Sequence, residues 1–292
     1  MAIITASVLD ADYARMRDEV VRVAEAGVDA FSLDVMDGHF VSRLTFGDYL
    51  VARVREWTRL PIEVHLMVEA PERWVLPMCD AGADMVVFHL EAAADPLEVI
   101  ERVRAERRLA GVALRHDTPV AALPDRLLEA ADLVNLVAVP LGYGGSASAT
   151  DTFQRIEELR ARIDAAGWAT AIEVDGGVKP ATASRYAEAG ADMLTVGTGI
   201  YHAPSAEEAV RTLHETTRGP RDERARSRLE RFLAVPSALS VGDRARRERL
   251  DRLRERLDVP RRVWDPLRSS PRMGARGTGA RPGGETGDTR HS

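Results

Sequence analysis

The chain is short of two reactive residue types and of long apolar runs. Its 292 residues include one lysine, Lys179, and one cysteine, Cys79. A Schiff base needs a lysine beside the substrate, and Lys179 is predicted to begin a helix outside the reactive face, which argues against that chemistry. One cysteine excludes an intrachain disulfide. No window approaches the roughly 18 apolar residues of a membrane span, and no basic segment precedes an apolar stretch at the N-terminus. We therefore expect a cytoplasmic protein without a membrane partner.

Acidic and basic residues are distributed unevenly. Of the 40 basic and 46 acidic residues, 19 arginines and 11 acidic residues lie beyond position 220. The first part is therefore net acidic and the rest net basic, which predicts a boundary between a domain over residues 1–218 and an Arg-rich extension over residues 219–292. A net acidic domain argues against nucleic acid as its partner.

The extension has a composition of its own. Asp222–Leu233 and Asp243–Leu257 are predicted to be charged amphipathic helices, and the Gly-, Pro- and Arg-rich end from Ser269 is predicted to be disordered. We expect a loosely packed appendage rather than an arm for oligomerisation or partner binding. A chain that ends near Gly219 is accordingly expected to fold and to remain active.

Eight short β-branched runs alternate with helical patterns over residues 3–216, which predicts βαβ units and a closed (β/α)₈ barrel. The predicted strands are Ile3–Val8, Ala30–Val35, Ile62–Leu66, Met85–His89, Gly111–Leu114, Leu133–Val139, Thr170–Val174 and Met193–Val196. The predicted helices include Tyr13–Glu25, Pro71–Cys79, Leu97–Arg107 and Phe153–Ala165. Three near-identical segments, which end in Asp29, Asp84 and Asp192, are predicted to be the turns from a helix into the next strand.

Polar side chains gather at the ends of these predicted strands. They are Ser7, Asp34, His65, His89 and Asp175. Catalytic groups of (β/α)₈ barrels lie at the C-terminal ends of the strands. Two carboxylates and two imidazoles on one such face predict an active site.

Glycine-bearing turns follow the last three strands. They contain Gly142, Gly144 and Gly145, then Gly176 and Gly177, then Gly197 and Thr198. Backbone amides in such turns can hold an anion without lysine, and phosphate is often bound after the last strands of a barrel. The turns therefore predict a phosphate subsite.

The chain resembles the ribulose-phosphate 3-epimerase family over about residues 3–210. The matching motifs are Asp34-Val-Met-Asp-Gly-His-Phe-Val41, Val64-His-Leu-Met67, His89-Leu-Glu-Ala92, Gly142-Tyr-Gly-Gly145 and Glu173-Val-Asp-Gly-Gly-Val178. The resemblance implies a barrel of the ribulose-phosphate-binding type, a phosphosugar as small-molecule partner, and a homo-oligomer.

The resemblance also implies a mechanism. Asp34 and Asp175 would each carry a proton on one face of an enediolate, because epimerisation at C3 needs an acid/base group on both sides. Asp34, His65 and Asp175 would hold one divalent metal ion, either Zn, Mn, Fe or Co, and His65 would also face the substrate with Ser7. Met36 and Met67 would line the site.

Departures from the family pattern cluster at the same face. The family's fourth ligand, a histidine two residues before the strand-two aspartate, is Ser32 here, so the metal is expected to be weakly bound. Ser42-Arg43 replaces a Pro-Asn pair, which makes Arg43 a candidate lining residue. The sequence leaves open an epimerase for ribulose 5-phosphate and xylulose 5-phosphate, one for another ketose phosphate or sugar, and a catalytically silent phosphosugar-binding barrel.

Overall fold

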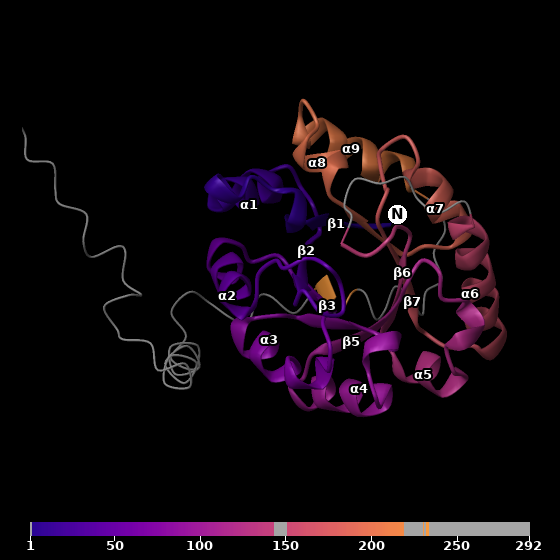
Figure 1. Ribbon diagram of the computed structural model, residues 1–292. Coiled ribbons are helices and arrows are strands. Elements are labelled where there is room, and N and C mark those ends of the chain that lie inside the picture. Colours follow the sequence, from indigo (N-terminus) through magenta and orange to yellow (C-terminus); the bar gives the residue numbers. More distant parts are fainter. Residues whose placement is uncertain (1, 143–150, 219–229, 231, 234–292) are drawn as a thin grey trace, which may run out of the picture. The chain divides into compact units, whose positions relative to one another are not determined.

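The computed structural model describes residues 2–142, 151–218, 230 and 232–233. They form a closed ring of eight parallel strands that pair in chain order, with the first strand also paired to the last (Figure 1). The strands are β1 Ile3–Ser7, β2 Ala30–Met36, β3 Ile62–Met67, β4 Met85–His89, β5 Leu109–Leu114, β6 Leu133–Val137, β7 Ala171–Asp175 and β8 Met193–Val196. The predicted (β/α)₈ barrel is confirmed.

The helices surround this ring (Figure 1). They are α1 Met16–Glu25, α2 Asp48–Trp57, α3 Val75–Ala81, α4 Pro96–Ala105, α5 Asp125–Ala130, α6 Thr152–Ala166, α7 Ala183–Ala189, α8 Thr198–Tyr201 and α9 Ala206–Thr216. Within the described ranges, every helix is too short or too polar to cross a membrane.

The observed elements differ from the predicted ones mainly at their ends. The strand predicted from Gly111 begins at Leu109, and the strand predicted to run to Val139 ends at Val137. Two predicted helices begin with a separate 3₁₀ turn, as Tyr13–Arg15 does before α1. Of the helix predicted over Asp222–Leu233, only residues 230, 232 and 233 are described, and they are helical; the rest of the extension lies outside the described residues.

The repeated turns have a common hydrogen bond. Asp29, Asp84 and Asp192 each accept a hydrogen bond from a backbone amide at or near a strand's start, those of Ile4, Ile62 and Ile172 respectively. Asp132 does the same for Ala110. A buried amide left without a partner would cost free energy, so these four aspartates stabilise the starts of β1, β3, β5 and β7 in the ring.

The inside of the ring is stacked in three levels, because residues two apart on a strand share a face. The N-terminal level is apolar and includes Ile3, Ala30, Leu133, Ala171 and Met193. Two positions later, the same strands carry Thr5, Ser32, Asn135, Glu173 and Thr195, all buried. Two positions later again, at the C-terminal ends, come Ser7, Asp34, Val137, Asp175 and Gly197. The predicted site residues therefore lie above a buried polar level.

One residue of the extension belongs to the apolar level. Phe232 is fully buried in one cluster with Ile3, Ala30, Leu133 and other residues at the strand starts. Barrel interiors are normally filled by bulky branched side chains, whereas Ala30 and Ala171 are small. The phenyl ring therefore supplies volume that the strands lack. This residue is not loosely packed as expected, and a chain that ends near Gly219 should be less stable than the full-length protein because it lacks the ring.

We predict that Phe232→Ala destabilises the full-length protein by about 3–5 kcal/mol, the usual cost of removing a buried phenyl ring. Leu233→Ala is the matched control, since Leu233 is adjacent and 37% exposed, and should cost far less. Denaturant unfolding of both variants measures the difference. Equal midpoints would show that Phe232 contributes no packing to the barrel.

Candidate functional site

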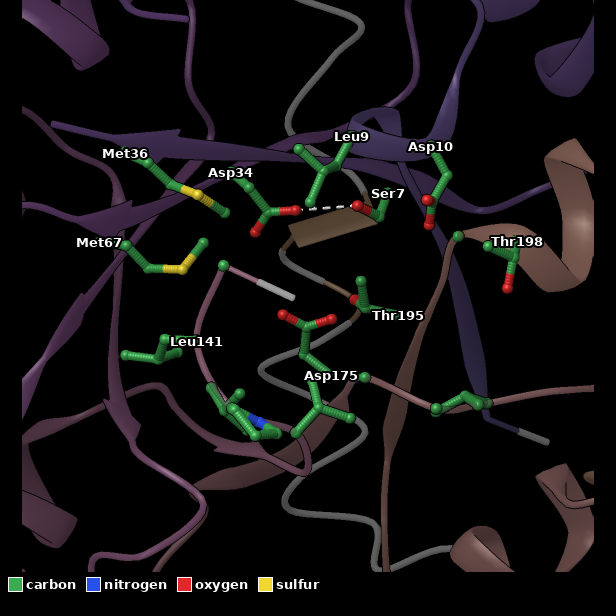
Figure 2. A pocket seen from close by; sticks show the side chains of 18 of the residues that line it. Ser7, Leu9, Asp10, Asp34, Met36, Met67, Leu141, Asp175, Thr195 and Thr198 are labelled. Carbon is green, nitrogen blue, oxygen red and sulfur yellow. Dashed lines mark hydrogen bonds between the residues drawn. The ribbon is translucent and has the colours of Figure 1, made fainter. Parts of the chain in front are cut away.

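A pocket opens at the C-terminal ends of the strands. Figure 2 shows Asp34 and Asp175 directed toward one another across it, with Met36 and Met67 on one flank and Asp10 and Thr198 on the other. The two methionines pack in a small apolar cluster with Val41. The structure therefore brings the predicted aspartates and methionines to one cavity.

Asp34 and Asp175, which line this pocket, form a compact group with His65. Nδ1 of His65 lies 3.1 Å from Oδ1 of Asp34 and 3.4 Å from Oδ2 of Asp175. One ligand atom from each residue falls within 4.8 Å of the others. Two carboxylates and an imidazole converging on one point are a donor set that suits a divalent transition metal.

The carboxylate of Asp34 is held in position by neighbours. Ser7 Oγ donates to its Oδ2 at 2.9 Å, and Thr45 Oγ1 donates to the Asp34 backbone carbonyl at 2.6 Å. Ser7, predicted to contact substrate, thus touches Asp34 and also lines the pocket. These contacts leave Oδ1 of Asp34 as the oxygen that faces His65.

Burial and mutual contacts shift the pKa values in this group. Burial raises the pKa of Asp175. Burial alone would lower the pKa of His65, but hydrogen bonds to Asp175 and Asp34 outweigh it and raise that pKa well above its ordinary value. A metal ion bound at Nδ1 would displace this proton.

A chain of buried polar side chains extends from His65. Nε2 of His65 lies 3.0 Å from Nε2 of His89, and Nδ1 of His89 lies 3.2 Å from Oε2 of Glu91. Burial lowers the pKa of His89 to about 4, so this imidazole is neutral at pH 7. Although burial opposes it, hydrogen bonds from His89, Thr118 and the amide of Arg115 lower the pKa of Glu91 to about 2. With Nδ1–H of His89 donating to Glu91, its Nε2 can accept from His65, which leaves Nδ1 of His65 free to bind a metal ion.

Ser32 lies one level below the metal-binding group. It is 1% exposed, and its Oγ donates to Oε1 of Glu63 at 3.4 Å. Burial raises the pKa of Glu63 well above its ordinary value and that of Glu173 to about 7. The hydroxyl at the predicted fourth-ligand position is therefore engaged with a carboxyl below the site.

The described residues of the predicted phosphate turns line the pocket. Gly142, Gly176, Gly177, Gly197 and Thr198 all line it. Gly176 and Gly177 have φ values of +100° and +71°, which glycine adopts without strain. Gly144 and Gly145 lie outside the described residues. Arg43 packs its aliphatic stem against Gly142 and is absent from the described residues that line the pocket.

Two charged lining residues escaped the sequence analysis. Lys179 was expected outside the mouth of the barrel; this was wrong, because it is exposed and lines the pocket at the phosphate turns. Asp10 comes from the 3₁₀ turn Val8–Asp10 after β1. No motif indicated Asp10, because it is not at the end of a strand and the 3₁₀ turn that brings it to the pocket was not predicted.

Sequence comparisons identify relatives of this barrel. The model of the Ribulose-phosphate 3 epimerase family matches residues 3–201. The ribulose-phosphate 3-epimerase of Bacillus subtilis is 37% identical over 205 residues, which cover 70% of this chain and 94% of that protein. The Escherichia coli enzyme is 34% identical over 209 residues, covering 71% and 92%. The residues that the family model matches run from β1 to α8, and Phe232 lies beyond them.

Solved structures support the fold alone. A 3-hexulose-6-phosphate synthase superposes with a TM-score of 0.55 at 20% identity, covering 75% of this chain and all of that one. Orotidine 5'-phosphate decarboxylase from Pyrococcus horikoshii gives a TM-score of 0.54, also at 20% identity, covering 74% of this chain and all of that one.

Proposed function

The chain belongs to the ribulose-phosphate 3-epimerase family, and from this premise we propose that it interconverts ribulose 5-phosphate and xylulose 5-phosphate. Membership places it among the isomerases that act on carbohydrates. The observation that carries the proposal is the pair of carboxylates, Asp34 and Asp175, facing one another across the pocket. The homo-oligomer and the location expected from the sequence stay predictions.

The two carboxylates are suited to opposite-face proton transfer. Asp34 lies near the C-terminal end of β2, and Asp175 is the last residue of β7. A substrate between them would therefore present one face of C3 to each. One carboxylate removes the C3 proton, and the other, in its acid form, returns a proton to the opposite face of the planar enediolate. Burial raises the pKa of Asp175, which favours the protonated form that donation requires.

The donor set fits one divalent metal ion. Asp34, His65 and Asp175 would hold it, and their ligand atoms already lie within 4.8 Å of one another. When bound, the ion would polarise the C2 carbonyl and offset the negative charge of the enediolate oxygens. We propose that this ion is Zn, Mn, Fe or Co and that it is weakly bound.

Apolar side chains exclude water on one flank. Met36 and Met67 are each 3% exposed and pack with Leu9 and Leu141 beside the pocket. An enediolate shielded in this way is less exposed to proton exchange with bulk solvent and to side reactions. On the other flank, Gly176, Gly177 and the Gly197-Thr198 turn would bind the phosphate through backbone amides.

Solvent exchange tests the proposal directly. The full-length protein is incubated in D₂O with Mn²⁺ and ribulose 5-phosphate, and NMR follows C3. We expect deuterium at C3 together with xylulose 5-phosphate. Incubation with other ketose phosphates serves as the comparison, and exchange with one of them alone would assign a different substrate. Absence of exchange with every ketose phosphate would contradict an epimerase and favour a silent binding barrel.

A further inference from the structure

Asp10 places a carboxylate at the predicted phosphate subsite. Its Oδ2 lies so close to Gly197 that a Cβ added there would be 1.9 Å away. Asp10 and Thr198 lie together on the same flank of the pocket (Figure 2). Burial raises the pKa of Asp10 above its ordinary value, although the nearby His202 and a hydrogen bond from the Thr198 amide oppose this shift. The carboxylate thus already uses one amide that a phosphate would need.

The charges that line the pocket do not compensate for this carboxylate. Three acidic side chains, Asp10, Asp34 and Asp175, face one ammonium group, that of Lys179, among the described lining residues. A metal ion at Asp34 and Asp175 would neutralise charge at the reacting carbons. Among the described lining residues, Lys179 would then be the one cation that offsets both Asp10 and a phosphate of about −1.5 to −2 charge at pH 7.

We infer, on the basis of the phosphosugar function proposed above, that Asp10 is a specificity-determining residue that limits the affinity of the Gly197-Thr198 turn for a phosphate dianion. A phosphate at this turn either meets a like charge at a few ångströms or displaces the carboxylate from the Thr198 amide. Both effects weaken ground-state and transition-state binding equally. The cost therefore falls on KM and leaves kcat almost unchanged.

The same carboxylate suits a ligand end with less negative charge. It can accept hydrogen bonds from a sugar hydroxyl, which a phosphate cannot offer when fully ionised. Asp10 should therefore narrow the preference for a phosphorylated ketose over a ketose with a terminal hydroxyl. Specificity of this kind comes from repulsion of one ligand as much as from attraction of another.

Charge-neutral variants of the full-length protein test the role of Asp10. Asp10→Asn keeps the side-chain shape, and Asp10→Ser removes most of the side chain. Both remove the negative charge, so the test can be made if either variant folds. Asp12→Asn is the matched control, because it removes the same charge only two residues away from Asp10. The Asp12 side chain caps the turn Tyr13–Arg15. Calorimetric titration with inorganic phosphate at constant Mn²⁺ should show at least roughly tenfold tighter binding for the Asp10 variants, since the like-charge repulsion at this range is strong. Asp12→Asn should match the wild type.

Kinetics separate this inference from the proposed function. Asp10→Asn should lower KM for ribulose 5-phosphate by a similar factor and leave kcat within about threefold. Unchanged or weaker phosphate binding by the Asp10 variants would overturn the inference, because it would show that Asp10 is neutral there or donates to phosphate. Tighter phosphate binding without C3 exchange in any form would support the subsite and overturn the epimerase proposal. Exchange with ribulose 5-phosphate but unchanged phosphate affinity in the Asp10 variants would support the epimerase proposal and overturn the role of Asp10.

Discussion

Asp34→Asn and Asp175→Asn are each expected to lower the epimerisation rate by about 10²–10⁴-fold, the usual loss when a positioned proton carrier is removed. The two carboxylates face one another across the pocket, and the third acidic group among the described lining residues, Asp10, lies on the flank with Thr198. Each substitution also removes a negative ligand from the group around His65. Saturating metal can offset the missing ligand but not the missing proton carrier, so the loss of rate should persist at saturating metal.

Isotope exchange distinguishes loss of one base from collapse of the site. A variant that lacks one carboxylate can still remove the C3 proton of the epimer that presents it to the other. We expect deuterium exchange with one epimer to outpace interconversion, and exchange with the other epimer to fall as far as interconversion does. Asp117→Asn is the control, since that carboxylate is 60% exposed. If either variant epimerises at most of the wild-type rate, the two-base assignment is wrong.

Much of the fold was predictable because short-range rules determine it. β-branched runs separated by helical patterns predicted all eight strands, and the repeated turns around Gly27, Gly82 and Gly190 marked three strand entries. These glycines have φ between +93° and +117°, a conformation that few other residues adopt. Asp34, His65 and Asp175 were predicted because each lies at or near a strand end, where the barrel topology brings such residues together.

The remaining features depend on contacts between distant parts of the chain. Asp10 and Gly197 are neighbours only because β1 closes the ring against β8. The register that sets Ser32 opposite Glu63 follows from strand pairing that periodicity does not specify. Phe232 was expected in a loosely packed appendage because the predicted helix that contains it is rich in charged residues. The strand starts that it packs against lie far away in the sequence.

Ser32 is the position at which a single substitution should change metal binding most. It lies two residues before Asp34 on β2, so its side chain enters the ring directly below the group of Asp34, His65 and Asp175. Ser32→His would add an imidazole where the family resemblance implies one. Glu63 Oε1, which now accepts from Ser32, could accept from the second ring nitrogen and orient the ring.

We expect Ser32→His to raise zinc affinity by at least about 100-fold, because loss of even an outer hydrogen-bond partner typically costs about 10–100-fold in metal affinity. The wild type, with three ligands, should bind zinc weakly and depend on added metal, with oxygen-preferring Mn²⁺ least affected by the missing imidazole. Zinc titration against a competing chelator measures both forms. Ser32→Asn is the control, since it adds a polar side chain that is a poor zinc ligand.

The rate on ribulose 5-phosphate then shows what the serine does for the enzyme. If the substrate is a pentulose phosphate, the added ligand should raise the rate at low metal concentration. One tight zinc per wild-type chain would refute the reading of Ser32 as a lost ligand, as would equal affinities for the histidine and asparagine variants. A histidine variant that gains zinc but no activity on any pentulose phosphate would indicate a different substrate. Specificity would then have to be sought where this chain departs from its family near the pocket, at Ser42-Arg43, whose arginine stem already packs against Gly142 of the phosphate turns.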